Sequence, residues 1–457
     1  MAGLVLERIR KAHPAELLVL SYIIAIGIGT TLLLLPWATV SGRIPFMDAL
    51  FTATSAICVT GLIVVDTGAY FTQWGQTILL VMIQLGGLGI MTASVVFFQL
   101  IGRRISYKQR MAVQGIFSHT PRADIYHLLK SIFLFTGVLE LAGTGALFLF
   151  WRDAYPSASE ALYVALFHSV SAFCNAGFSL FANSFADYQG AWLLNITVCA
   201  LIVLGGIGFP VVYEFYARAS QRPETRTRMS VQAKTVMTTS LILIVSGMVV
   251  FLCCEGAKLE QGQWGKSVLQ ALFQSVTCRT AGFNTVEISS LMDTTLAFFL
   301  FLMLFGASPG SCGGGIKTTT LAILSMASWS RFRGRTNVTL FRRNIPRETV
   351  QRSISIFLLA VGVISVALFL LLLFQQGHAE AAPDHRRFLT SLFEVVSAFG
   401  TVGLSMGATG ELHGPGKLLI IVLMLVGRVG VLTFAYLFLG SDATGGIERA
   451  QENVMIG

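Results

Sequence analysis

Four short segments, each carrying one glycine, are the part of this sequence best suited to specific chemistry. The glycines are Gly61, Gly177, Gly282 and Gly403, and they recur about every 115 residues. Glycine allows backbone conformations that turn carbonyl oxygens toward one point, and a ring of such oxygens can replace part of the hydration shell of a cation. The pattern therefore predicts a filter for a dehydrated monovalent cation rather than a catalytic centre.

Each glycine ends a similar stretch of about a dozen residues, which is too short to cross a bilayer. We interpret the stretch as a re-entrant half-helix whose negative dipole end points at a pore. Ordinary helix breaks are the alternative, but recurrence in all four segments favours the filter. The third stretch is one residue shorter, which leaves open whether all four segments coordinate equally. The candidate filter residues are Cys58, Val59, Thr60, Gly61, Cys174, Asn175, Ala176, Gly177, Arg279, Thr280, Ala281, Gly282, Gly400, Thr401, Val402 and Gly403.

The composition requires a membrane around these segments. Hydrophobic residues make up 54% of the chain and charged residues only 12%, whereas soluble domains carry about 25% charge. Apolar runs flank every half-helix, at about 15–38, 73–101, 126–151, 189–216, 233–254, 294–330, 353–375 and 415–440. We therefore expect an all-α integral membrane protein with four pseudo-repeats of helix, re-entrant pore half-helix with filter loop, and helix around one central pore.

Charge orients this arrangement, because the connections between the repeats are rich in arginine and lysine and should face the cytoplasm. Both termini are then cytoplasmic, and the net charge of +9 reflects topology and lipid headgroups rather than nucleic acid. The seven cysteines lie in apolar or glycine-rich surroundings, which argues against a disulfide framework or a zinc site. The expected segments are a cytoplasmic N-terminus (1–14), repeats at 15–102, 126–218, 233–331 and 350–440, and a cytoplasmic C-terminus (441–457).

The last run of the third repeat predicts a break beneath the filter. A straight helix from Met292 to Arg331 would extend about 60 Å, twice the hydrocarbon core. Residues 306–315 are rich in glycine and include Pro309, so the break should fall in a loop at 306–320. A loop at this depth is a candidate gate, and a static kink is the alternative. The candidate gate residues are Gly306, Ser308, Gly310, Ser311, Gly313, Gly314, Gly315, Lys317 and Arg428.

Ionisable residues inside apolar runs need partners, because an uncompensated charge at mid-bilayer costs at least about 2.5 kcal/mol. For Arg428 we expect carbonyls or hydroxyls of the 306–320 loop, with snorkelling to the interface as the alternative. Lys317 either pairs in the same way or marks the cytoplasmic mouth, and Glu140 should make a hydrogen bond between helices. Three polar residues early in half-helices have either vestibule or structural roles: His168, Gln274 and Glu394.

Taken together, these motifs resemble the Trk/Ktr/HKT superfamily of potassium transporters over essentially the whole chain. The resemblance rests on the four filter stretches and on three further segments, Arg279-Thr-Ala-Gly-Phe-Asn284, the Gly306 to Thr320 stretch and Gly427-Arg-Val-Gly430. Eight spans without additional N-terminal helices, and the sequence Lys-Thr-Thr-Thr at Lys317, are most similar to the membrane subunits of Ktr systems. Glycine in all four filters points to potassium, since some relatives that favour sodium carry serine in the first.

The resemblance implies potassium uptake across the cytoplasmic (inner) membrane, with potassium as the substrate and a gating role for the 306–320 loop. It also implies a membrane homodimer, a cytoplasmic nucleotide-binding regulatory ring of the KtrA type, and sodium dependence. No organic cofactor is expected on this chain. Potassium would be bound by the backbone carbonyls of Thr60, Ala176, Ala281 and Val402.

Two other functions compete with gated, passive potassium flow. An ion-coupled symporter would bind sodium or protons at carbonyls near the filter or at Glu140. A membrane-embedded enzyme would need reactive groups, yet the sequence shows no paired carboxylates, no histidine-rich metal spacing and no nucleophile elbow. The sequence therefore favours a transporter and leaves the coupling open.

Overall fold

Four long apolar helices frame the protein in its computed structural model, which describes residues 14–89, 125–219, 228–256, 264–376 and 386–439. Within these ranges four continuous helices are long and apolar enough to cross a membrane, and one bent helix pair can form a fifth span. The long helices are α2 (Pro14–Leu33), α8 (Ile125–Trp151), α12 (Val231–Glu255) and α16 (Arg347–Gln376). The expected all-helical membrane architecture is confirmed.

A shorter helix follows each long one, and its C-terminal half is buried. The short helices are α3 (Phe46–Cys58), α9 (Ala158–Phe173), α13 (Trp264–Thr277) and α17 (Arg387–Gly400). At 13 to 16 residues they are about 20 to 24 Å long, which is less than the bilayer core. They coincide with the stretches that the sequence predicts as half-helices.

The second helix of each unit is α5 (Gln73–Leu88), α10 (Trp192–Ile207), α14 (Asp293–Leu304) or α19 (Gly414–Val429). After a break, the chain continues as α11 (Phe209–Ala219), α15 (Thr318–Phe332) and α20 (Val431–Leu439) in the last three units. The runs predicted at 189–216 and 415–440 are therefore interrupted and do not form single continuous helices. Gly208 and Gly430 interrupt them with φ of 97° and 95°, and α10 meets α11 at 96°. Gly89 ends α5 in the same way, and the rest of the run to 101 lies outside the described residues.

Connections hold the short elements η1 (Pro36–Ala38), α4 (Thr67–Tyr70), η2 (Ala186–Tyr188), η4 (Ile288–Ser290) and α18 (Ala408–Glu411). One connection contains a β-hairpin that the sequence does not predict. Its strands are β1 (Thr339–Leu340) and β2 (Arg343–Asn344), with Leu340 opposite Arg343. With two residues in each strand, the hairpin is a local feature of one connection and leaves the all-α architecture unchanged. The two termini and the connection at 103–122 lie outside the described residues.

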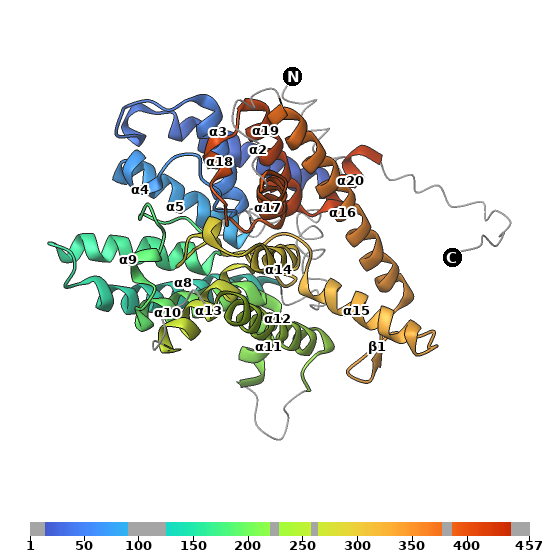
Figure 1. Cartoon of the computed structure of the whole chain (residues 1–457). Helices are drawn as coiled ribbons and strands as arrows, with labels where there is room; N and C mark the ends of the chain where they lie inside the picture. The colour runs from blue at the N-terminus through green and yellow to red at the C-terminus, as the bar shows by residue number, and fades with distance from the viewer. Residues whose placement is uncertain (1–13, 90–124, 220–227, 257–263, 377–385, 440–457) are drawn as a thin grey trace.

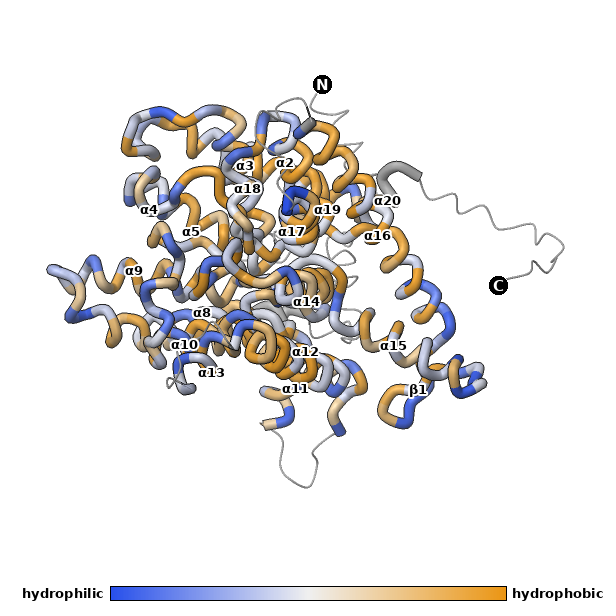
Figure 2. Tube along the Cα trace, viewed as in Figure 1, coloured by the Kyte–Doolittle hydropathy of each residue, from blue (hydrophilic) through white to orange (hydrophobic). Residues whose placement is uncertain are grey.

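The four units form a closed circle. In chain order, α5 packs on α9, α10 on α13, α14 on α17, and α19 returns to α3, so each second helix contacts the half-helix of the next unit. Figure 1 shows the units following one another around a common centre, and Figure 2 shows apolar residues along their helices. One buried hydrophobic cluster extends through all four units, and a second, small cluster joins α11 to α12. This circular packing places the four half-helix ends together.

Candidate ion filter and gate

The four candidate filter segments share one backbone conformation. In each, a non-glycine residue with positive φ is followed two residues later by a glycine with positive φ. The angles are 56° and 87° at Val59 and Gly61, 58° and 69° at Asn175 and Gly177, 68° and 82° at Thr280 and Gly282, and 49° and 91° at Thr401 and Gly403. Left-handed backbone is costly for residues with a Cβ, so four repeats of the same pair indicate a geometry imposed by packing.

The glycines and the carbonyls that precede them form a closed ring. A Cβ added to Gly61 would lie 2.5 Å from the Ala176 oxygen, one on Gly177 would lie 2.8 Å from the Ala281 oxygen, and one on Gly282 would lie 2.6 Å from the Val402 oxygen. A Cβ on Gly403 would overlap the Thr60 oxygen, which closes the circle. Each glycine thus leaves room for the carbonyl of the next unit. The four carbonyls are those that the sequence assigns to the ion.

The shorter third stretch does not disturb this ring. The amides of Thr60, Ala176 and Val402 each donate over 2.8 Å to a carbonyl five residues earlier, whereas the Ala281 amide donates over 3.0 Å to Thr277, four residues earlier. The missing residue is therefore absorbed at the end of α13. All four filter segments keep the same conformation, so the difference in length gives no reason for unequal coordination.

A hydroxyl in each half-helix supports the filter from behind, and the sequence analysis missed these residues. Ser55 and Ser397 accept from the amides of Gly61 and Gly403, both at 3.1 Å. Ser171 and Thr277 donate to the carbonyls that follow the filter glycine, at 2.8 and 2.5 Å. A serine or threonine stands six residues before the filter glycine in three of the stretches and five residues before it in the shorter third stretch. This recurrence is the sequence signal that could have identified these residues.

The residues before the left-handed position belong to the half-helix ends rather than to the ring. Cys58 and Gly400 are the last residues of α3 and α17, and Cys174 caps α9. Arg279 is buried, and its side chain leaves the filter: Nη2 donates to the Ser240 hydroxyl at 2.9 Å and Nε to the Gly306 carbonyl at 3.3 Å. Arg279 therefore connects the third filter segment to α12 and to the loop beneath.

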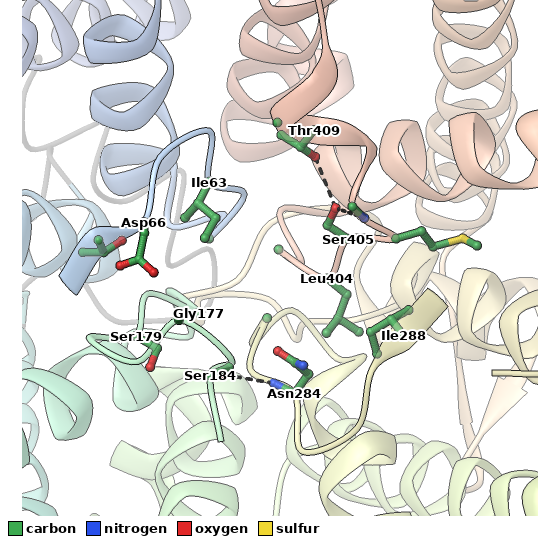
Figure 3. A pocket seen from close by; sticks show the side chains of 18 of the residues that line it. Ile63, Asp66, Gly177, Ser179, Ser184, Asn284, Ile288, Leu404, Ser405 and Thr409 are labelled. Carbon is green, nitrogen blue, oxygen red and sulfur yellow. Dashed lines mark hydrogen bonds between the residues drawn. The ribbon is translucent and has the colours of Figure 1, made fainter. Parts of the chain in front are cut away.

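A cavity of about 500 Å³ opens on one side of the ring, and all four filter glycines line it. Figure 3 shows Asp66, Ser179, Asn284 and Ser405 around this vestibule. Hydroxyl, amide and carboxylate oxygens are suitable partners for a hydrated cation that approaches a filter. The vestibule thus places oxygen atoms at the entrance to the ring, among apolar side chains such as Ile63 and Leu404.

The three polar residues early in the half-helices hold the vestibule loops. Glu394 accepts from the Ser405 hydroxyl at 2.6 Å, from the Met406 amide at 2.9 Å and from the Thr409 hydroxyl. His168 contacts the Ser179 hydroxyl at 3.1 Å, and the Gln274 amide lies 3.3 Å from the Thr285 hydroxyl. With its side-chain amide turned over, Gln274 also accepts from the Thr285 amide at 3.0 Å. These contacts favour the structural role over direct contact with ions.

We expect Glu394→Ala to lower the melting temperature of the purified protein by several degrees. Glu394 is fully buried, and its loss would remove the acceptor of three hydrogen bonds, at about 1.5 to 3 kcal/mol for each bond to a charged group. The melting temperature of Glu394→Gln, which keeps an acceptor, should lie between those of Glu394→Ala and the parent protein. Glu411→Ala is the matched control because Glu411 is exposed in α18. An unchanged melting temperature in Glu394→Ala would exclude the structural role.

The segment between α14 and α15 lies on the other side of the ring and binds to the broken ends of other second helices. The amides of Ser308 and Cys312 donate to Gly206 and Gly205 of α10, both at 3.2 Å, and the Gly315 amide donates to Gly427 of α19 at 3.1 Å. In return, the Phe209 amide donates to the Gly310 carbonyl at 2.9 Å. The helix breaks therefore supply the backbone groups that the loop needs.

The loop also packs directly against the filter. The Gly314 amide donates to the Thr401 hydroxyl at 2.8 Å, and a Cβ on Gly306 or Gly313 would overlap the Thr280 side chain. Glycine is therefore needed at these two positions for close packing against Thr280. This reason adds to the helix weakening that the sequence predicts. The loop ends are held together, since the Thr318 amide donates to Ala307 at 2.9 Å.

Arg428 joins the loop to the first and last units. It donates to the Cys312 carbonyl, to the Gly86 carbonyl at the end of α5, and to the Tyr22 hydroxyl at 3.3 Å. The contact expected between Arg428 and the loop is present, and Lys317 pairs likewise, donating to the Gly313 carbonyl at 2.7 Å.

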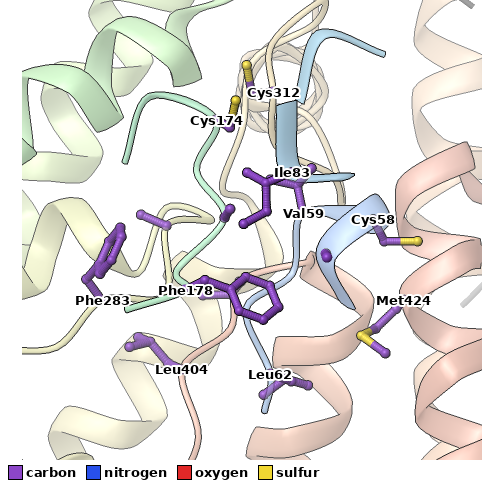
Figure 4. Packing of buried hydrophobic residues seen from close by; sticks show 14 of the residues in the cluster. Cys58, Val59, Leu62, Ile83, Cys174, Phe178, Phe283, Cys312, Leu404 and Met424 are labelled. Atoms are coloured by element: carbon purple, nitrogen blue, oxygen red, sulfur yellow. The ribbon is translucent and has the colours of Figure 1, made fainter. Parts of the chain in front are cut away.

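The expected inter-helix bond of Glu140 is also present, with Gln84 as donor at 3.2 Å. Figure 4 shows Val59, Ile83, Cys174 and Cys312 close together in the buried core.

This combination of a glycine and carbonyl ring with a loop beneath it can be compared with known proteins. A family model described as TrkH: Cation transport protein matches residues 8–444. The chain belongs to the TrkH family. Two similar relatives are named Ktr system potassium uptake protein B: that of Vibrio alginolyticus is 36% identical over 95% of this chain and 93% of the relative, and that of Bacillus subtilis is 38% identical over 93% of each.

Two further comparisons agree with the TrkH assignment. The potassium/sodium uptake protein NtpJ of Enterococcus hirae is 34% identical over 99% of both chains. The crystal structure of the potassium transporter TrkH from Vibrio parahaemolyticus superimposes with a TM-score of 0.73 at 20% identity, covering 94% of this chain and 86% of the other. The structural likeness supports the fold of this TrkH-family chain.

Proposed function

We propose that this chain takes up potassium ions across the cytoplasmic membrane through one gated pore. The observation that carries the proposal is the closed ring in which each filter glycine accommodates the carbonyl of the next unit. The names of the similar relatives support potassium as the ion, and the name of NtpJ adds sodium.

In this mechanism an ion enters the vestibule, exchanges water for the carbonyls of Thr60, Ala176, Ala281 and Val402, and passes toward the loop. The C-terminal ends of the half-helices point their negative dipoles at the ring and favour a cation there. A membrane potential of 100 mV supplies about 2.3 kcal/mol per charge, which suffices for uptake without a second ion. The loop at 306–320 closes the inner side until its contacts are released.

The proposal includes three further features that rest on the resemblance to Ktr membrane subunits. They are a homodimer in the membrane, a nucleotide-binding ring of the KtrA type on the cytoplasmic side, and sodium dependence of uptake. The relatives' name, Ktr system, supports an assembly of several components. In this arrangement the nucleotide-binding regulatory subunits would act on the 306–320 loop through the helices that continue beyond the breaks.

Flux measurements in proteoliposomes test the proposal. We expect an imposed potential to drive potassium and rubidium uptake with no sodium or proton gradient, and the flux to reverse at the potassium equilibrium potential. A proton-coupled symporter is the second candidate, because the Glu140 carboxylate lies between Gln84 and, at 3.9 Å, the Cys174 thiol. Potassium accumulation that follows an imposed pH gradient, and is lost in Glu140→Gln, would replace passive flow with symport. No potassium flux under either gradient would refute both.

A further inference from the structure

Helix α15 and the following β-hairpin extend outward from the circle of units, as Figure 1 shows. Three large aromatic side chains on this extension are exposed: Trp329 by 52%, Phe332 by 87% and Phe341 by 45%. Exposed Trp rings at the end of a membrane helix are typical of the interface between hydrocarbon and headgroups, and Phe rings occur on the apolar face of interfacial helices. The extension thus has the apolar side chains of an interfacial anchor.

The charged side chains of this extension are all positive. Residues 318–347 contain six arginines and no aspartate or glutamate. Within the part of the chain that the structure describes, none of these arginines forms an ion pair with a carboxylate. The Arg333 guanidinium lies 4.8 Å from the centre of the Trp329 ring. The six arginines are Arg331, Arg333, Arg335, Arg342, Arg343 and Arg347.

The hairpin turn places large residues where a turn of this kind favours small ones. Phe341 and Arg342 form the two-residue connection, and both have positive φ, at 47° and 64°. Two-residue turns with this backbone strongly prefer Asn-Gly, because both residues have positive φ, which asparagine and glycine adopt more readily than other residues. Strained residues of this sort concentrate at binding sites. The turn therefore suggests that the Phe341 ring and the Arg342 charge contact a bound partner.

The start of α16 indicates how far the hairpin lies from the hydrocarbon. Charged residues occupy its first turns, at Arg347, Glu348 and Arg352, and the apolar part begins at Ile354. Seven residues of helix span about 10 Å, and the headgroup region is about 5 to 8 Å deep on each side of the core. The hairpin just before Arg347 is thus at the outer edge of the headgroups, within reach of arginine side chains.

We propose that the end of α15 and the hairpin, residues 329–344, form a binding site for anionic phospholipid headgroups of the adjacent leaflet. Guanidinium groups bind phosphate oxygens with two parallel hydrogen bonds, and anionic lipids attract clustered arginines. The aromatic rings would enter the interface beside them. This site goes beyond the proposed ion pathway and does not depend on which ion passes.

The site would also connect the lipid to the candidate gate. Helix α15 begins at Thr318, whose hydroxyl lies 3.0 Å from that of Ser308 in the loop. A lipid that holds the far end of α15 limits the movement of this helix. The loop would then be tethered at its C-terminal end.

Native mass spectrometry of the delipidated full chain tests the site, with phosphatidylglycerol and phosphatidylcholine as the probes. We expect more phosphatidylglycerol than phosphatidylcholine to be retained, with the difference falling at high salt. Arg342→Ala combined with Arg343→Ala should lower the retained phosphatidylglycerol at least about threefold. The matched control, Arg43→Ala with Arg152→Ala, removes the same charge at the opposite end of the spans. It should leave the retained phosphatidylglycerol unchanged.

A second variant separates binding from folding of the hairpin. Phe341→Asn with Arg342→Gly supplies the residues that the turn prefers, so the hairpin should persist while both side chains are lost. We expect this variant to lose phosphatidylglycerol as well. Unchanged retention in both variants, or equal retention of the two lipids by the parent chain, would overturn the proposal. Lost dimerisation or lost binding of a cytoplasmic ring protein, with lipid retention unchanged, would assign the surface to a protein partner instead.

Discussion

Serine in place of Gly403 is expected to raise the apparent Km for potassium uptake roughly tenfold or more and to weaken discrimination against sodium. A Cβ at this position would overlap the Thr60 oxygen, which is one of the four proposed ligands. The carbonyl must move outward, and the ring then fits a dehydrated potassium ion less well. Uptake by cells that lack their own potassium transport, measured over a range of potassium and sodium concentrations, gives both parameters.

Gly407→Ser is the matched control for this experiment. Gly407 lies in the same vestibule loop with φ of 96°, close to the 91° of Gly403, but a Cβ there would meet nothing within 4 Å. Both substitutions therefore place serine on left-handed backbone, and only one disturbs the ring. Equal kinetics in the two variants, at equal protein in the membrane, would show that the ring does not select the ion.

Sequence patterns located the ring because its requirements are local. A left-handed turn and close approach of carbonyls both need glycine, so Gly61, Gly177, Gly282 and Gly403 were identifiable from recurrence alone. The contact of Arg428 was predictable for a similar reason, since a cation at membrane depth must find acceptors. Its acceptor in α5, the Gly86 carbonyl, was not predictable, because that carbonyl is available only where the helix ends.

Features that depend on tertiary contacts were not accessible in this way. A glycine-rich run is compatible with either close helix packing or a break, and only the loop contacts at Gly205 and Gly206 decide for the break after α10. The side-chain direction of Arg279 depends on Ser240, which is 39 residues away in the sequence. The hairpin lacks the Asn-Gly signal because Phe341 and Arg342 occupy its turn.

Arg428→Ala is expected to increase the maximal rate of potassium uptake severalfold while changing the apparent Km by less than about twofold. Bonds from a charged donor contribute about 1.5 to 3 kcal/mol each, which is the size of a free-energy difference that can hold a gate closed. Arg428 contacts the loop at Cys312 but makes no bond to the filter ring. Tyr22→Phe is the control, since it removes only the tyrosine partner and should leave uptake unchanged.

Deletion of residues 308–314 should raise the maximal rate further, because it removes the obstacle itself. The geometry permits the deletion: the Thr318 amide already donates to Ala307 at 2.9 Å, so residues 315–317 can close the gap. The deletion also removes the Gly314 amide from the Thr401 hydroxyl, and we therefore expect a larger change in Km than in Arg428→Ala. Uptake rates are compared at equal protein in the membrane and equal melting temperature. A stable deletion variant whose maximal rate is unchanged or lower would mean that the loop is a static kink and that the barrier to potassium lies elsewhere.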